Sequence, residues 1–173
     1  FFTFFILLSF SCEKSVHHSI PKTANEALTA LMEGNERFIN NASIHHNFID
    51  EAHHSEKEQH PHTFVLSCID SRVPPEIVFD QGIGNLFVAR VAGNIEDPNI
   101  LGSMEYAVQV KGTKLLVVLG HSNCGAVQGA IDNVNLGHLT QLTNQIKVAF
   151  SKHKTYPLPE HLSDETGRLN VIS

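Results

Sequence analysis

The segment Phe64-Val65-Leu66-Ser67-Cys68-Ile69-Asp70-Ser71-Arg72 joins a short apolar run to a polar motif. A second apolar run, Leu115-Leu116-Val117-Val118-Leu119, is followed by His121-Ser122-Asn123-Cys124. Short apolar runs of this kind are typical of buried strands, and we predict that the run 114–119 is fully buried. Because functional groups gather at the carboxyl ends of the strands in a parallel sheet, the two polar motifs are expected to meet.

The rest of the sequence alternates between strand and helix patterns. Thr23-Ala24-Asn25-Glu26 has the spacing of a capping box and predicts an amphipathic helix over 24–40, whereas the polar segment 41–62 is predicted to be irregular. Further elements are predicted as a short helix starting at Pro75, a strand over 87–91, and helices over 100–109, 125–131 and 140–150. This alternation predicts an α/β fold with a mainly parallel β-sheet flanked by helices.

Length and composition indicate one soluble domain. The chain has 173 residues, of which 42% are hydrophobic, and a net charge of −6. It has no basic stripe, so nucleic acid is not expected as a partner. Six histidines are concentrated in the polar segment, where they are interpreted as solvated loop residues or as a loose metal-binding tract: His45, His46, His53, His54, His60 and His62.

The first ten residues are almost wholly apolar and are followed by Ser11-Cys12. Ten residues are too few to span a bilayer, which needs about 20, but they fit the apolar core of an export signal. We therefore predict a leader and linker over 1–22 and a functional domain over 23–173. Cys12 is a candidate lipid-anchor site, which would place the protein in a bacterial cell envelope or periplasm. A plain apolar extension on a cytoplasmic protein is the alternative.

The two motifs together offer a set of metal ligands. Cys68, His121 and Cys124 would supply two thiolates and one imidazole, the soft and borderline donors that zinc prefers. If Asp70 completed the coordination, the site would be closed, and structural or resting. If water completed it, zinc would lower the pKa of that water from about 15.7 towards about 7. A purely structural zinc site and a metal-free pair of buried thiols both remain open alternatives.

The presence of Arg72 suggests that its guanidinium holds or releases the Asp70 carboxylate. A guanidinium can hold a carboxylate in a two-bond pair, which would draw Asp70 away from the metal and orient it as a hydrogen-bond acceptor. Asp70 could then align a zinc-bound hydroxide for attack. We therefore predict catalytic roles for both residues.

The sequence resembles the β-class carbonic anhydrases. Cys-x-Asp-x-Arg at 68–72 and His-x-x-Cys at 121–124 match the zinc motifs of that family, and the similarity extends from Leu31 to about Ile131. The resemblance implies zinc-dependent, reversible hydration of carbon dioxide to bicarbonate and a proton. It assigns Cys68, His121 and Cys124 as zinc ligands, with Asp70 and Arg72 as a gating dyad.

The resemblance also implies substrate-binding residues and an assembly. Gln59 matches a glutamine that lies near the substrate in the family, often across a subunit interface. Phe87 and Tyr106 match aromatic positions that line the pocket, and plain core packing is the alternative for both. A homodimer or a larger oligomer is therefore expected. Because family members continue beyond the region around 167–171, the chain is expected to lack a C-terminal helix and edge strand.

Two rival functions fit the same motifs. One is a related hydrolase acting on carbonyl sulfide or carbon disulfide with the same metal site. The other is a non-catalytic domain that zinc merely stabilises.

Overall fold

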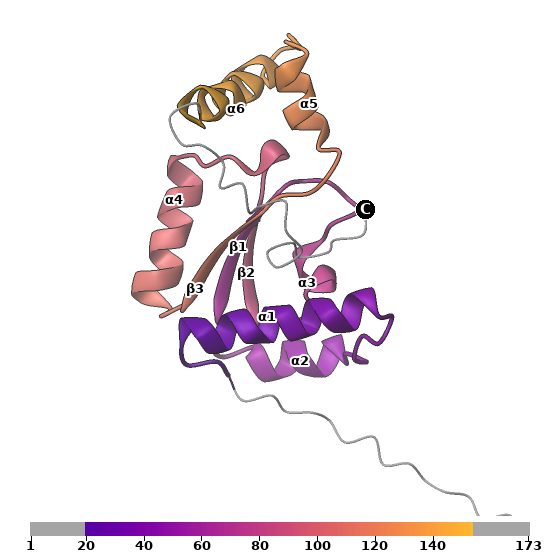
Figure 1. The fold of residues 1–173 in the computed structure, drawn as a ribbon. Helices are drawn as coiled ribbons and strands as arrows, with labels where there is room; N and C mark the ends of the chain where they lie inside the picture. Colours follow the sequence, from indigo (N-terminus) through magenta and orange to yellow (C-terminus); the bar gives the residue numbers. More distant parts are fainter. Residues whose placement is uncertain (1–19, 154–173) are drawn as a thin grey trace, which may run out of the picture.

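The computed structural model describes residues 20–153, so the predicted leader and Cys12 lie outside the described residues. Figure 1 shows a small sheet with helices on both of its faces and a pair of helices beyond one end. The elements in chain order are α1 (Ala24–Ile39), α2 (Phe48–Ser55), β1 (Thr63–Ser67), α3 (Pro75–Val78), β2 (Leu86–Arg90), the 3₁₀ turn η1 (Ala92–Asn94), α4 (Pro98–Glu105), the π-helical turn η2 (Tyr106–Val110), β3 (Leu115–Leu119), α5 (Gly125–Ile131) and α6 (Leu139–His153).

The sheet confirms the predicted fold class. Its three strands are parallel and lie in the order β2-β1-β3. The register pairs Ser67 of β1 with Arg90 of β2 on one side and with Leu119 of β3 on the other. All three strands therefore end level with one another, and the loops that follow them start from the same edge.

One apolar cluster lies on each face of the sheet. On the α1 face, Leu31, Val65, Phe79 and Leu119 form a buried cluster. On the α4 face, Phe64, Leu66 and Ala107 are buried, with Ile100 and Met104 of α4 packed against them. β1 contributes to both clusters, and its five residues are all buried. This explains why its sequence is continuously apolar rather than alternating.

The Thr23 cap of the predicted capping box is present at the start of α1, but Glu26 bonds the backbone N–H of Lys22 rather than that of Thr23. Thr23 Oγ1 accepts the backbone N–H of Glu26 at 3.2 Å, and Glu26 Oε2 accepts the backbone N–H of Lys22 at 2.6 Å. The helix then runs to Ile39, one residue short of the predicted end. Local chemistry alone therefore located this helix.

Three predictions about local structure need correction. The segment 41–62 contains the helix α2, which is capped by Asn47 and has no buried residue. β3 is not fully buried, because it is the edge strand of the described sheet. Leu116 and Val118 are 47% and 63% exposed on the α4 side of the sheet. The predicted helix over 100–109 is also divided, since α4 gives way to the π-helical turn at Tyr106.

Within residues 20–153, no helix has both the length and the apolar character needed to cross a membrane.

Candidate metal centre

The two motifs meet at the carboxyl edge of the sheet. Cys68 directly follows β1, while His121 and Cys124 follow β3, whose last residue is paired in register with Ser67. The sulfur atoms of the two cysteines are 3.8 Å apart, and one ligand atom from each of the three residues lies within 4.8 Å of the other two. The predicted convergence is confirmed.

The environment of His121 fits a metal ligand. Its side chain is 1% exposed, and its Nδ1 lies 2.8 Å from the carbonyl oxygen of Ser122. That contact fixes Nδ1 as the N–H donor and leaves a lone pair on Nε2, as in many metal-binding histidines. Nε2 is buried and has no hydrogen-bond partner, which is costly unless a cation accepts its lone pair. With two sulfurs beside it, the donor set is the one that zinc prefers.

The surroundings of Cys68 favour its thiolate form. Burial raises the pKa of this thiol, but the neighbouring His121 and Cys124 side chains and the backbone N–H groups of Gly93 and Asp70 together lower it below its ordinary value. The Gly93 N–H lies 3.4 Å from the sulfur. Because metals bind cysteine as the thiolate, this environment prepares the residue for a cation.

Asp70 and Arg72 form a two-bond ion pair. Arg72 Nε donates to Asp70 Oδ1 at 2.9 Å, its Nη2 donates to Oδ2 at 2.8 Å, and its backbone N–H also reaches Oδ1 at 3.0 Å. These bonds hold the pKa of Asp70 well below its usual value. Oδ2 also lies 3.9 Å from His121 Nε2, so the carboxylate borders the centre.

Asp70 is not one of the three residues whose ligand atoms are mutually within 4.8 Å. Its carboxylate is instead held by Arg72, as the sequence suggested. Coordination of a metal by Asp70 in another state stays a prediction.

The predicted substrate residues lie away from the ligands in this chain. Gln59 is exposed in the loop before β1, at the opposite end of the sheet. Phe87 and Tyr106 contact each other edge to face, with ring centroids 6.3 Å apart, in a groove between β2 and α4. No metal-ligand residue lines that groove. Substrate contacts by these three residues stay predictions.

The histidine-rich segment does not form a second group of three potential ligands within the described residues. His46 and His62 instead bond to Glu51 and Gln81 at 2.8 and 3.3 Å. The other four histidines of the segment are exposed.

Sequence reasoning missed two residues that contact Cys68 from β2 and the turn after it. Arg90 hydrogen-bonds the carbonyl oxygen of Cys68, and Gly93 hydrogen-bonds its sulfur. The available signal was an arginine at the end of a predicted strand, with a glycine three residues later. That pattern becomes informative only when the strand order is known.

Comparison with known proteins agrees with this geometry. A family model described as carbonic anhydrase matches residues 63–173. Carbonic anhydrase 2 of Mycobacterium tuberculosis is 46% identical over 114 residues, which cover 65% of this chain and 55% of that protein. Carbonic anhydrase of Pseudomonas aeruginosa is 35% identical over 120 residues, covering 66% of this chain and 54% of that protein.

Two solved structures show the same fold. The Coccomyxa β-carbonic anhydrase in complex with acetazolamide has a TM-score of 0.56 and 26% identity, covering 76% of this chain and 61% of that one. Tetrameric β-carbonic anhydrases from Sordaria macrospora give a TM-score of 0.54 and 27% identity, covering 85% and 72%. The fold and the three candidate ligands thus define an α/β domain with a candidate metal centre. The chain belongs to the β-class carbonic anhydrase family.

The chain spans about half the length of curated relatives that it matches.

Proposed function

We propose that the protein containing this chain catalyses the zinc-dependent, reversible hydration of carbon dioxide to bicarbonate and a proton. The observation that carries the proposal is the group formed by Cys68, His121 and Cys124, with the unpartnered Nε2 of His121 and the Asp70–Arg72 pair at its border. The similarity of the chain to proteins named carbonic anhydrase supports the same reaction.

The charges of the side chains suit this chemistry. Cys68 and Cys124 would hold Zn²⁺ as thiolates, with His121 as the neutral third ligand. When bound, zinc supplies a Lewis acid that makes a water molecule acidic near neutral pH. The two thiolates would offset the charge of the metal, and the positive charge of Arg72 is balanced by Asp70.

Asp70 is suited to orient a reacting water. It is ionised, it borders the centre, and Arg72 holds both of its oxygens. In this position the carboxylate acts as a hydrogen-bond acceptor whose direction is fixed before substrate arrives. Arg72 acts through Asp70, because both of its side-chain bonds go to that carboxylate.

The proposal is tested by measuring zinc content and stopped-flow hydration of carbon dioxide on the same preparation. We expect one zinc per chain and activity in the wild type, with both lost in Cys124→Ser. Zinc without hydration would favour the non-catalytic, zinc-stabilised domain. Turnover of carbonyl sulfide that exceeds that of carbon dioxide would favour the sulfur-analogue hydrolase.

We also propose that the protein works as a homodimer or a larger oligomer. Gln59 is exposed at the end of the sheet opposite to the ligands, so it can serve a metal centre only by reaching that of another subunit. Solved relatives include tetramers. Light scattering and a Gln59→Ala variant, assayed for activity, test this arrangement.

Export to the cell envelope, with Cys12 as a lipid anchor, is a separate proposal that rests on the apolar residues 1–10. Metabolic labelling with a fatty acid, compared between the wild type and Cys12→Ser, tests it.

A further inference from the structure

The candidate metal ligand Cys68 is the first residue after the end of β1. β1 ends at Ser67, so the carbonyl groups of the following residues have no strand partner. Two of these carbonyls are bound by one side chain. Arg90 Nε donates to the carbonyl oxygen of Cys68 at 2.9 Å, and its Nη2 donates to that of Asp70 at 2.5 Å. Both acceptors therefore belong to residues that carry the chemistry of the centre.

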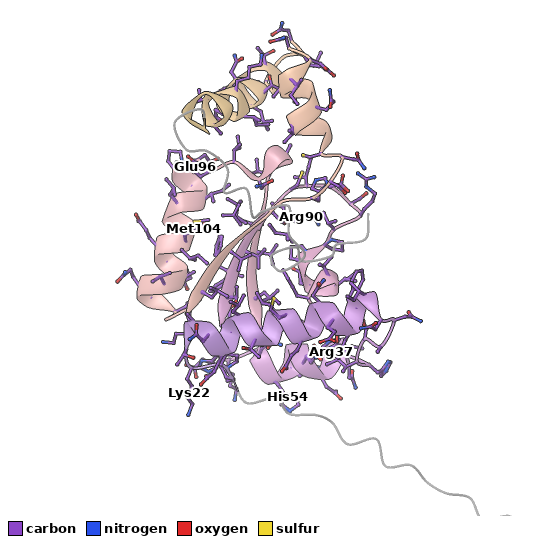
Figure 2. All side chains as sticks on the ribbon, viewed as in Figure 1. Lys22, Arg37, His54, Arg90, Glu96 and Met104 are labelled. Carbon is purple, nitrogen blue, oxygen red and sulfur yellow. The ribbon has the colours of Figure 1, made fainter. Side chains whose placement is uncertain are left out.

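The position of Arg90 follows from the register of the sheet. Arg90 is the last residue of β2 and is paired with Ser67, the last residue of β1. Its side chain consequently starts beside the exit of β1 and reaches the loop directly. Figure 2 labels Arg90 near the middle of the molecule and Lys22 at the lower left, beside the start of α1.

The residues that follow Arg90 also contact Cys68 and the residue before it. The backbone N–H of Val91 donates to the carbonyl oxygen of Ser67 at 3.0 Å, and that of Gly93 lies 3.4 Å from the sulfur of Cys68. Gly93 has a φ of +71°, and a Cβ at this position would lie 2.6 Å from Ile146 Cδ1. Residues 90–93 thus contact Cys68 at both its backbone and its sulfur.

We propose that Arg90 is a positioning residue of the metal centre. Its guanidinium fixes the backbone of 68–70, so that the Cys68 sulfur and the Asp70 carboxylate are presented to the centre together. Any effect of Arg90 on catalysis rests on the proposed function. Its effect on metal binding does not, because metal binding can be measured whether or not the protein hydrates carbon dioxide.

The shape of the side chain matters as much as its charge. A guanidinium presents several N–H donors in a rigid plane and can bind two acceptors at once, whereas an ammonium is a compact charge on a flexible stem. Arg90 is also exposed, so its removal costs little apolar burial. A positioning role therefore predicts that lysine is a poor replacement, although it keeps the charge.

The test compares Arg90→Ala and Arg90→Lys with Lys22→Gln, which removes an exposed positive charge far from the centre. Zinc affinity is measured by competition with a chelator, and ligand geometry by the absorption spectrum of the cobalt-substituted protein. Loss of an outer partner of a metal ligand lowers metal affinity about 10–100-fold. We expect a loss in that range for Arg90→Ala, a smaller loss for Arg90→Lys, altered cobalt bands in both, and wild-type behaviour in Lys22→Gln.

Addition of guanidinium at millimolar concentration should restore part of the zinc affinity of Arg90→Ala, and sodium at the same ionic strength should not. Zinc affinities within twofold of wild type and unchanged cobalt spectra in both variants would overturn the proposal, even if the metal-free variants unfold at lower temperature. A wild type that binds zinc without hydrating carbon dioxide would refute the proposed function. The zinc affinities and cobalt spectra of the variants would still decide the role of Arg90.

Discussion

At the scale of single residues, the Asp70 carboxylate is the group whose removal separates metal binding from catalysis. Asp70→Asn keeps the size of the side chain but removes the charge that Arg72 holds through two bonds. Positioned proton-accepting groups contribute about 10²–10⁴-fold to rates. We expect hydration activity to fall within that range while zinc content stays at the wild-type level.

Asp132→Asn is the matched control, since Asp132 is exposed and bonds only locally, to Gln128 at 3.0 Å. Unchanged activity in Asp70→Asn would remove Asp70 from the mechanism. Equal loss of activity in both variants would point to a general effect of charge.

The same ion pair makes a prediction about pH. Hydrogen bonds from Arg72 hold the pKa of Asp70 well below its usual value. A carboxyl with a lowered pKa in the folded state contributes stability at pH values above its unfolded pKa of about 3.9, and loses it as the pH falls through the folded pKa. We therefore expect the Asp70 carboxyl carbon to show no titration between pH 4 and 8 in ¹³C NMR. A midpoint inside that window would contradict the ion pair.

At the scale of elements, α1 is placed by a close approach that only glycine permits. A Cβ on Gly34 would lie 1.8 Å from the carbonyl oxygen of Phe79, whereas a Cβ on Gly102 of α4 would meet nothing within 4 Å. Overpacking costs about 1–3 kcal/mol, and replacing a glycine in an exposed helix by alanine gains about 0.5–1 kcal/mol.

Urea unfolding should therefore show a large loss of stability for Gly34→Ala, and no loss or a small gain for Gly102→Ala. Equal effects of the two substitutions would mean that α1 can shift away from the end of α3 without cost.

The elements also show what a sequence can and cannot specify. α1 was predictable because its cap and its apolar face are local. α2 was not, because none of its residues is buried and its attachment is polar, with Glu51 accepting from His46 and from the backbone of Ile83 at 2.8 Å each. The exposed face of β3 escaped prediction because an apolar run does not reveal whether the strand lies at the centre or the edge of a sheet.

At the scale of the whole molecule, the motifs were predictable because residue types carry the chemistry, and a parallel sheet brings the ends of its strands together. The hydrogen bonds from Arg90 to the loop after β1 were not predictable, because they depend on β2 lying beside β1. The register then sets a guanidinium next to a loop 20 residues away in sequence. Contacts of this kind arise from topology rather than from any local pattern.

The metal centre also joins two parts of the molecule. Cys68 directly follows β1 of the sheet, whereas Cys124 is the N-cap residue of α5, which packs mainly against α6 and η1 beyond the end of the sheet. A cation bound by both cysteines therefore fastens the α5–α6 pair to the sheet. Ligands that bind only the folded state stabilise it, by about 4 kcal/mol at a concentration 1,000 times the dissociation constant.

Removal of zinc should consequently loosen one part of the chain before the other. We expect hydrogen exchange of the chelator-treated protein to rise first over 121–149, while β1 and α1 keep their protection through the two apolar clusters. Cys124→Ser should show the same pattern with or without added zinc. A uniform rise over all described elements would mean instead that the metal stabilises the domain as a single cooperative unit, and no rise would mean that α5 and α6 are held by protein contacts alone.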